Sequence, residues 1–296
     1  VKSKLRKGGV PNQPQVFTPR PHERDKLRTA LRSLKNRDAW VVLHGMAGCG
    51  KTVLAADALR SASLLDETFP GGVVWVQIGP VDRPKLLMKM QNLCKRLDED
   101  KHRPEPRNLE EARDRLQNLF TDQHPFKLLV LDDLWSAHDA RFFDIRARVL
   151  VTTRDVSIAE CIEVTRCPVS VAEKLSSPQC RDILAQWTKT KKTELPREAD
   201  DIIKECNGHP LVISIFGALL RDHPQRWSYY WTQFHHHKLG KFTPKFAYDY
   251  PGLNEAIAMS IDNLEEKLRD KFFDFVIFDL SIKVPLSVFC LLWDME

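Results

Sequence analysis

One eight-residue motif constrains this chain more than any other feature of its sequence. It follows the pattern G-x-x-x-x-G-K-[ST] and consists of Gly45, Met46, Ala47, Gly48, Cys49, Gly50, Lys51 and Thr52. An apolar run precedes it at Ala39–Leu43, and a stretch with helical periodicity follows it. A strand, a glycine-rich turn and a helix in this order bind phosphate, because the curled backbone and the helix N-terminus point N–H groups at an anion. We therefore expect Lys51 to reach the β- and γ-phosphates of a nucleotide and the Thr52 hydroxyl to hold Mg²⁺.

Two acidic residues follow a second aliphatic run and supply the other half of such a site. Asp132 and Asp133 come directly after Leu128–Leu131. Taken alone, acids at this place also mark strand exits and helix caps. With a phosphate-binding loop upstream, we interpret Asp132 as the residue that holds Mg²⁺ through water, and Asp133 as a base that orients or activates the attacking water. We expect the neighbouring Trp135 to pack in the core or at the rim of the site.

A third run ends in a cation. The aliphatic residues of Val149–Thr153 are followed by Arg154. If this strand lies next to the strand that leads into the phosphate-binding loop, Arg154 lies beside the phosphates and can pair bidentately with the oxygens of the γ-phosphate. We therefore predict that Arg154 senses this phosphate. The alternative is a solvated arginine at a strand end.

Strand and helix signals alternate over the first part of the chain. The predicted strands are Ala39–Leu43, Val73–Ile78, Lys127–Leu131, Val149–Thr153 and a short one between Val164 and Val171. Continuous aliphatic strands separated by amphipathic helices indicate an α/β fold, a P-loop NTPase parallel sheet with helices on both faces. Beyond about Ser176 only helix signals remain. We divide the chain into a basic linker (1–20), an α/β nucleotide-binding domain (21–172), a helical domain (173–248) and a third segment (249–296).

Charge and composition narrow the classes of partner. The net charge is +5, but the first 35 of the 296 residues carry ten Lys and Arg against two acids, so the remaining chain has a net charge of −3. A uniformly basic surface for nucleic acid is therefore not expected. No apolar run approaches the roughly 20 residues of a membrane span, so we expect no membrane partner. Seven scattered cysteines without a C-x-x-C pair favour reduced thiols and a cytoplasmic location.

Together, four motifs resemble the NB-ARC module of signalling ATPases. They are Gly45–Thr52, Leu131–Trp135, Thr152–Arg154 and Gly208–Leu211. Longer stretches, among them residues 40–60, 202–224 and 284–296, are most similar to the apoptotic members of that family. The resemblance covers nearly the whole chain, from about residue 9 to its end.

The resemblance implies a function and further site residues. It implies a switch, similar in design to AAA+ ATPases, that is closed with ADP and opens with ATP or dATP to drive apoptosome-type assembly into a ring and activation of an initiator procaspase. It implies a winged-helix domain in residues 249–296. It also implies that Thr18 and Arg20 lie near the adenine, and that Pro210 and Ser214 reach the nucleotide from the helical domain. His209 departs from the family pattern, which has leucine there, but it leaves Pro210 in place.

Other parts of the apoptotic members lie outside this sequence. In the family, a caspase-recruitment domain precedes the linker, and WD repeats that sense cytochrome c follow the helical segments. The winged-helix histidine that contacts the β-phosphate is expected beyond Glu296. We therefore expect the chain to be a piece of a longer protein, one that binds nucleotide but engages neither the procaspase nor cytochrome c by itself.

Three alternatives to the switch remain at this point. A continuously cycling AAA+-like ATPase is one, although Asp133 is shorter than the glutamate that positions water in many such enzymes, so we expect slow hydrolysis at most. A small-molecule kinase is another, but no segment offers an arginine-rich lid. A pure interaction module with an inactive site is the third. The intact Lys51, Thr52 and Asp132 argue against it.

Overall fold

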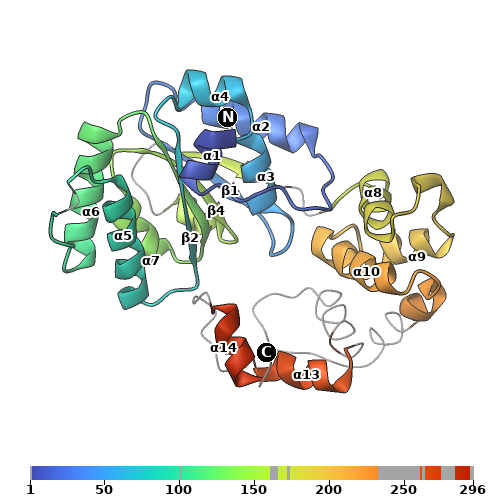
Figure 1. The fold of residues 1–296 in the computed structure, drawn as a ribbon. Coiled ribbons are helices and arrows are strands. Elements are labelled where there is room, and N and C mark those ends of the chain that lie inside the picture. The colour runs from blue at the N-terminus through green and yellow to red at the C-terminus, as the bar shows by residue number, and fades with distance from the viewer. Residues whose placement is uncertain are drawn as a thin grey trace. The chain divides into compact units, whose positions relative to one another are not determined.

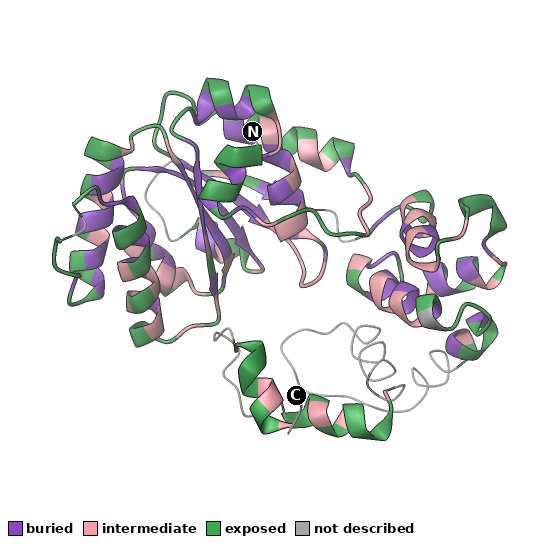
Figure 2. Cartoon of the chain, viewed as in Figure 1, coloured by how far each residue is buried: buried purple, intermediate pink, exposed green. Residues whose placement is uncertain are grey.

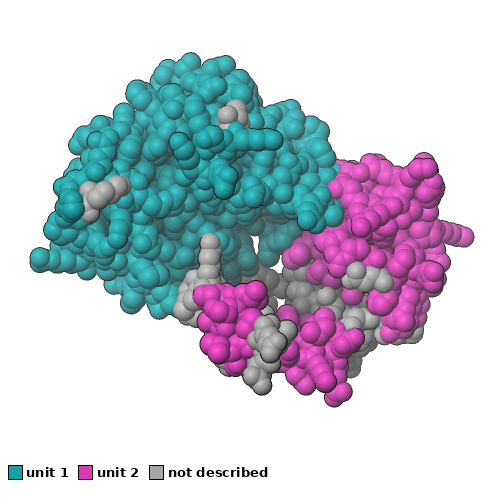
Figure 3. All heavy atoms as spheres, viewed as in Figure 1, with its two compact units in different colours: residues 1–173 teal, residues 174–296 magenta. Residues whose placement is uncertain are grey.

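The computed structural model describes residues 2–100, 102–160, 166–171, 174–232, 261, 264–274 and 284–293. The chain divides into two compact units, residues 1–173 and 174–296 (Figure 3). Each unit has its own secondary structure (Figure 1). Within these described ranges, no helix combines the length and the apolar character that crossing a bilayer requires.

The first unit is built around a five-stranded parallel sheet with the strand order β2-β3-β4-β1-β5. The strands are β1 (Trp40–His44), β2 (Val73–Gly79), β3 (Leu128–Leu134), β4 (Arg148–Thr153) and β5 (Arg166–Ser170). β1 pairs with β4 on one side and with β5 on the other. Because all strands run in the same direction, their carboxyl ends share one edge of the sheet. The predicted parallel sheet is confirmed.

Helices cover both faces of this sheet because its strands bury apolar side chains on both sides. Trp40 and Val42 pack into one core with α5 (Arg83–Leu97), α6 (Leu109–Asn118) and α7 (Ala137–Ala140). Val41 and Leu43, which point the other way, pack with α1 (Lys2–Gly8), α2 (Pro21–Arg32), α3 (Lys51–Ala58) and α4 (Ala62–Thr68). Figure 2 shows the buried strands between helices whose outer faces are exposed.

Short helical turns complete the first unit. They are a π-helical turn at Leu119–Gln123 and 3₁₀ turns at Arg141–Phe143 and Val156–Ala159. Helices α1 and α4 were not expected from the sequence, and α1 lies within the predicted linker. Its basic residues conceal the apolar signal, since only Leu5 and the following Val10 are buried apolar side chains. Gly8 lets α1 approach β2, because a Cβ at this position would lie 2.3 Å from the carbonyl oxygen of Val73.

The second unit is helical where the structure describes it. Its helices are α8 (Ser177–Thr188), α9 (Glu198–Glu205), α10 (Pro210–Asp222), α13 (Glu266–Phe273) and α14 (Leu286–Leu292), with a 3₁₀ turn at Lys192–Glu194. Cys180, Leu184, Ile202 and Phe216 are buried between the first three. Much of the region from 249 to 296 lies outside the described residues, so the winged-helix assignment and the four-part division of the chain stay predictions.

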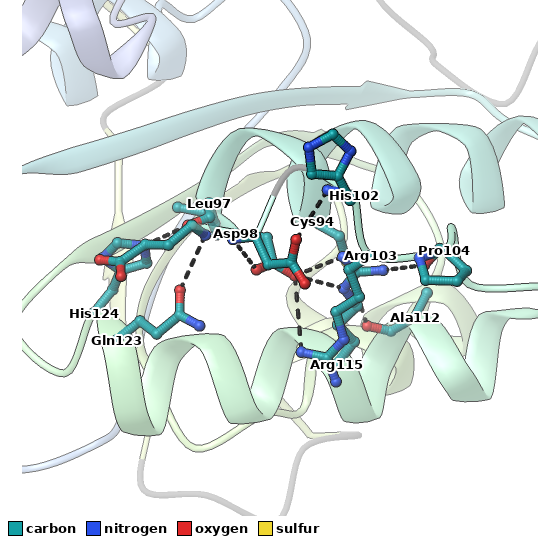
Figure 4. Close-up of polar contacts among 12 residues, drawn as sticks. Cys94, Leu97, Asp98, His102, Arg103, Pro104, Ala112, Arg115, Gln123 and His124 are labelled. Atoms are coloured by element: carbon teal, nitrogen blue, oxygen red, sulfur yellow. Dashed lines mark hydrogen bonds and ion pairs between the residues drawn. The ribbon is translucent and has the colours of Figure 1, made fainter.

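A buried ion pair holds the connection between α5 and α6 (Figure 4). The Asp98 carboxylate accepts hydrogen bonds from Nε and Nη2 of Arg115 at 3.1 and 2.5 Å, and Asp98 is only 2% exposed. Arg115 also donates to the carbonyl oxygen of Pro104. Burial alone would raise the pKa of Asp98, but hydrogen bonds from Arg115 and from the backbone N–H of Asp100 hold this pKa below its ordinary value.

Arg115→Met is expected to lower the free energy of unfolding by about 3 kcal/mol at neutral pH, because it leaves the buried Asp98 carboxylate without its hydrogen-bonded cation and with only the more distant Arg103, 3.8 Å away. A lowered carboxyl pKa stabilises the folded state above the ordinary value near 4, and this stabilisation disappears as falling pH protonates the group. The loss should therefore shrink on acidification. Urea unfolding at several pH values measures it.

Arg113→Met is the matched control for this prediction. Arg113 lies on the same helix, but its partner is the exposed carboxylate of Asp114. We expect a change in the free energy of unfolding below about 0.5 kcal/mol. Equal losses in the two variants would contradict the role given to the buried pair.

Candidate functional site

The predicted phosphate-binding loop connects β1 to α3 at the carboxyl edge of the sheet. Its backbone turns with positive φ at Gly48 (71°) and Gly50 (93°), a region that residues with a Cβ rarely adopt. Gly50 precedes the first residue of α3, so the N-terminus of the helix faces the loop. Cys49 is fully buried and burial raises the pKa of its thiol, which makes it a packing residue that contributes only its backbone to the loop.

The side chain of Lys51 lies within this loop. Its ammonium donates to the carbonyl oxygens of Gly45 and Met46, both at 2.8 Å. Burial lowers the pKa of Lys51, and the positive charge of Arg154 lowers it further. A buried ammonium held at the loop can form a charge-assisted hydrogen bond to a phosphate. The negative charge of the phosphate would offset the free-energy cost of burying the ammonium.

Thr52 and Asp132 are far apart in the sequence but in direct contact in the fold. Thr52 Oγ1 donates to Asp132 Oδ1 at 2.8 Å, and Thr152 Oγ1 donates to the same oxygen at 2.6 Å. Asp132 is 4% exposed, and burial raises its pKa although these two hydrogen bonds and one from Trp75 act in the opposite direction. Burying the charged Asp132 carboxylate therefore costs free energy, and a cation bound beside it would offset this cost.

This pair of oxygen ligands fits Mg²⁺. Mg²⁺ prefers hard oxygen ligands, keeps several waters, and commonly binds through one or two protein groups together with phosphate oxygens. Thr52 and Asp132 offer a hydroxyl and a carboxylate side by side. Over the described ranges, no group of three or more His, Cys, Asp and Glu side chains is placed to hold a metal ion. The donor set thus suits a nucleotide-bound Mg²⁺ better than an all-protein metal centre.

Asp133 occupies an irregular place at the end of β3. The register between β3 and β4 shifts between Leu131 and Leu134, and Asp133 takes the left-handed φ of 57° within this bulge. Its backbone N–H donates to Thr152 Oγ1 at 2.8 Å, and its carboxylate lies 3.7 Å from Arg154 Nε. Thr152 therefore connects the two acids. It was not among the predicted site residues, although it precedes Arg154 by only two residues.

Arg154 meets the condition under which it was predicted to act as a sensor. β4 pairs directly with β1, and Thr153 lies in register with His44, the residue before the phosphate-binding loop. Arg154 thus directly follows a strand that is paired with the strand leading into the loop. Its guanidinium also lies over the ring of Trp135, 4.3 Å from the ring centroid.

Arg20 approaches the loop from the segment before α2. Its Nη1 donates to the carbonyl oxygen of Cys49 at 2.8 Å, while its other nitrogens bind the carboxylate of Glu23. Arg20 is 7% exposed, so this contact is part of the core of the site. Thr18 is half-buried two residues earlier. The structure brings Arg20 to the loop backbone, and the approach of Thr18 and Arg20 to an adenine base stays a prediction.

Pro210 and Ser214 belong to the second unit. Pro210 is the first residue of α10, and Ser214 Oγ donates back to the Pro210 carbonyl oxygen at 2.9 Å. Both side chains are half-buried. Their contact with a nucleotide stays a prediction.

Comparisons with known proteins agree with this geometry. Residues 21–194 match the NB-ARC domain model. The whole chain is 44% identical to human apoptotic protease-activating factor 1 over 298 aligned residues, which are 24% of that protein. Cell death protein 4 of Caenorhabditis elegans is 26% identical over 224 residues, 72% of this chain and 40% of that protein.

A solved structure resembles the fold at much lower identity. The Walker-type ATPase of Pyrococcus abyssi has a TM-score of 0.51 and 15% identity, over 92% of this chain and 88% of its own. This likeness concerns the fold alone. The chain spans about a quarter of the length of the vertebrate relatives it matches. The match to the family model covers more than half of the chain and includes the predicted phosphate-binding loop. The protein therefore belongs to the NB-ARC domain family.

Proposed function

We propose that this chain is the nucleotide-operated switch of an apoptotic assembly protein, binding ATP or dATP and ADP together with Mg²⁺. One observation carries the proposal. The fold brings Lys51, the contact between Thr52 and Asp132, and Arg154 to one edge of the sheet. This edge of a parallel sheet is where α/β proteins bind nucleotides.

Each residue has a distinct part in binding. The loop backbone and Lys51 attract the phosphates, and Thr52 and Asp132 would hold Mg²⁺, which neutralises phosphate charge when bound. Arg154 is the cation suited to a third phosphate, because its planar donors match phosphate oxygens. Asp133 is placed beside these groups to orient a water molecule.

Slow hydrolysis is the expected activity. Asp133 lies 3.7 Å from Arg154 Nε, so the carboxylate that would orient water faces a cation. Arg154 therefore competes with a water molecule for this carboxylate. This arrangement suits a protein that holds its nucleotide and exchanges it, and it does not favour the continuously cycling ATPase.

A switch also requires two states that bind nucleotides differently. A ligand shifts a conformational equilibrium only by the difference between its affinities for the two states. Arg154 supplies such a difference between ATP and ADP, since the third phosphate is the group it would contact. Pro210 and Ser214 would extend the same difference to the helical unit if the nucleotide reaches them.

The apoptotic setting rests on relatives. Similarity to apoptotic protease-activating factor 1 and to cell death protein 4 supports a role in cell death. We extend this to self-association into a ring, to engagement of an initiator procaspase and cytochrome c through parts of such a protein that lie outside this sequence, and to a cytoplasmic location. We propose no nucleic-acid or membrane partner.

Lys51→Ala is expected to lower nucleotide affinity by about 100-fold, because it removes the buried charge-assisted contact to the phosphates. The measurement is acid denaturation of the purified chain, followed by chromatography of whatever nucleotide it releases. We expect stoichiometric nucleotide from the parent and little from the variant. Lys89→Ala, which removes a lysine bonded to the carbonyl of Gln77, is the control. Equal release from the parent and Lys51→Ala would exclude the assigned loop.

Arg154→Ala is expected to reduce the affinity for ATP relative to ADP by roughly 10- to 100-fold, the range for a lost charged hydrogen bond. Calorimetric titration of the nucleotide-stripped chain with each nucleotide measures the ratio. Arg146→Ala, an exposed arginine just before β4 at the opposite end of that strand, is the control. An unchanged ratio in Arg154→Ala would remove its role as sensor.

Asp132→Asn is expected to abolish the Mg²⁺ dependence of ATP binding and to stabilise the nucleotide-free chain at neutral pH. Burial raises the pKa of Asp132, so the folded state keeps this proton to a higher pH than the unfolded state. The carboxyl therefore destabilises the folded chain as pH rises above the ordinary value of about 4, and asparagine removes this cost.

Thermal unfolding over a range of pH tests this prediction. The difference in midpoint temperature between Asp132→Asn and the parent should grow as pH rises from about 4 towards neutral. Asp133→Asn is the matched control, because asparagine also tolerates the left-handed backbone there and should leave Mg²⁺-dependent binding in place. A variant at position 132 that is less stable than the parent at neutral pH would show that the carboxylate is net stabilising.

A further inference from the structure

Trp135 lies against the side chain that the proposed function uses to recognise the third phosphate. The Arg154 guanidinium lies 4.3 Å from the centroid of the Trp135 ring, and Arg154 Nε lies 3.7 Å from the Asp133 carboxylate. The second distance is too long for a hydrogen bond. The contact with the ring therefore restricts the position of the guanidinium. Trp135 itself is 38% exposed.

The bulge in β3 creates this contact. Leu131 pairs with Val151, but beyond the bulge Leu134 pairs with Thr153. Without the extra residue, Leu134 would lie opposite Arg154. With the extra residue, Leu134 pairs with Thr153 instead. The next residues along the two strands, Trp135 and Arg154, therefore lie side by side where the strands end.

We propose that Trp135 is a positioning residue for Arg154, and that it sets how well the site distinguishes a nucleoside triphosphate from a diphosphate. Tryptophan is the aromatic side chain that binds guanidinium best, and the contact strengthens when water is excluded. A long arginine side chain otherwise loses rotamer freedom when it binds a phosphate. The ring already restricts the Arg154 side chain before nucleotide binds. Binding a third phosphate therefore costs less conformational entropy, and less affinity is lost. This inference rests on the proposed function and specifies how its discrimination arises.

The ring also counterbalances Asp133. Asp133 and a third phosphate are two anions that can attract the same guanidinium. A side chain held over the ring can turn its donors between them without leaving its place. Without the ring, Arg154 can move onto the carboxylate or turn towards water, and both movements weaken binding of the triphosphate while leaving the diphosphate unaffected.

The test compares Trp135→Leu, Trp135→Phe and the parent in affinity for ADP and for the β,γ-imido analogue of ATP, each with Mg²⁺. Calorimetry on the nucleotide-stripped full chain gives both dissociation constants without any turnover. We expect Trp135→Leu to weaken binding of the analogue roughly three- to ten-fold with ADP unchanged, the range for a partly desolvated cation–π contact. Trp135→Phe should restore most of this loss. In an Arg154→Ala background, Trp135→Leu should cause no further loss.

A control variant lies at the other end of the same two strands. Near the start of β3 and β4, the guanidinium of Arg148 lies over the ring of Phe126, 5.4 Å from the centroid of that ring. Phe126→Leu removes a similar contact far along the strands from the loop, and it should leave both affinities at their parent values.

The outcomes separate this inference from the function on which it rests. An unchanged affinity ratio in Trp135→Leu, an equal loss for both nucleotides, or a further loss in the Arg154→Ala background would overturn the positioning role while nucleotide binding by the parent still supports the switch. A parent chain that binds neither nucleotide would overturn the proposed function, and the role of Trp135 with it.

Discussion

The pairing of β4 with β1 on one side and β3 on the other is the constraint on which the site depends. Parallel strands end at a common edge, so this order collects the ends of three strands within reach of one loop. Lys51, Asp132 and Arg154 come from three separate stretches of sequence, and none of them would be near the others without it. The aliphatic residues that bury these strands on both faces hold the order in place.

Thr152 is where the sheet and the site meet. Its hydroxyl donates to the Asp132 carboxylate and accepts from the backbone N–H of Asp133, so one side chain on β4 fixes two acids on β3. This contact also supports the bulge, since Asp133 holds a left-handed backbone there. The bulge in turn brings Trp135 abreast of Arg154. A local backbone irregularity is thus linked to the proposed recognition of nucleotide.

Where the signal was local, the sequence pointed to residues of the first unit that the structure brings to one edge of the sheet, and their roles in binding stay predictions. The glycine pattern, the position of Lys51 at a helix start, and the acids after an aliphatic run all express physics that operates over a few residues. Arg154 was assigned under a stated condition on strand order, which the structure meets. Thr152 was named only as part of the Thr152–Arg154 motif and was given no role in the site, because a threonine inside a strand carries no signal of its own until the neighbouring strand is known. Helix α1 was missed because only two apolar side chains anchor it among basic residues.

By itself, the sequence determined the class of fold and the glycine-rich turn between β1 and α3 that is the proposed phosphate-binding loop, because hydrophobic periodicity and glycine patterns act through short-range backbone geometry. The tertiary structure alone decided which strands are neighbours, that Arg20 reaches the loop carbonyl of Cys49, and that Trp135 lies against Arg154. These contacts join residues that are distant in the chain or displaced by a one-residue shift in register. Such a shift changes which side chains are in contact, but the local sequence pattern does not reveal it.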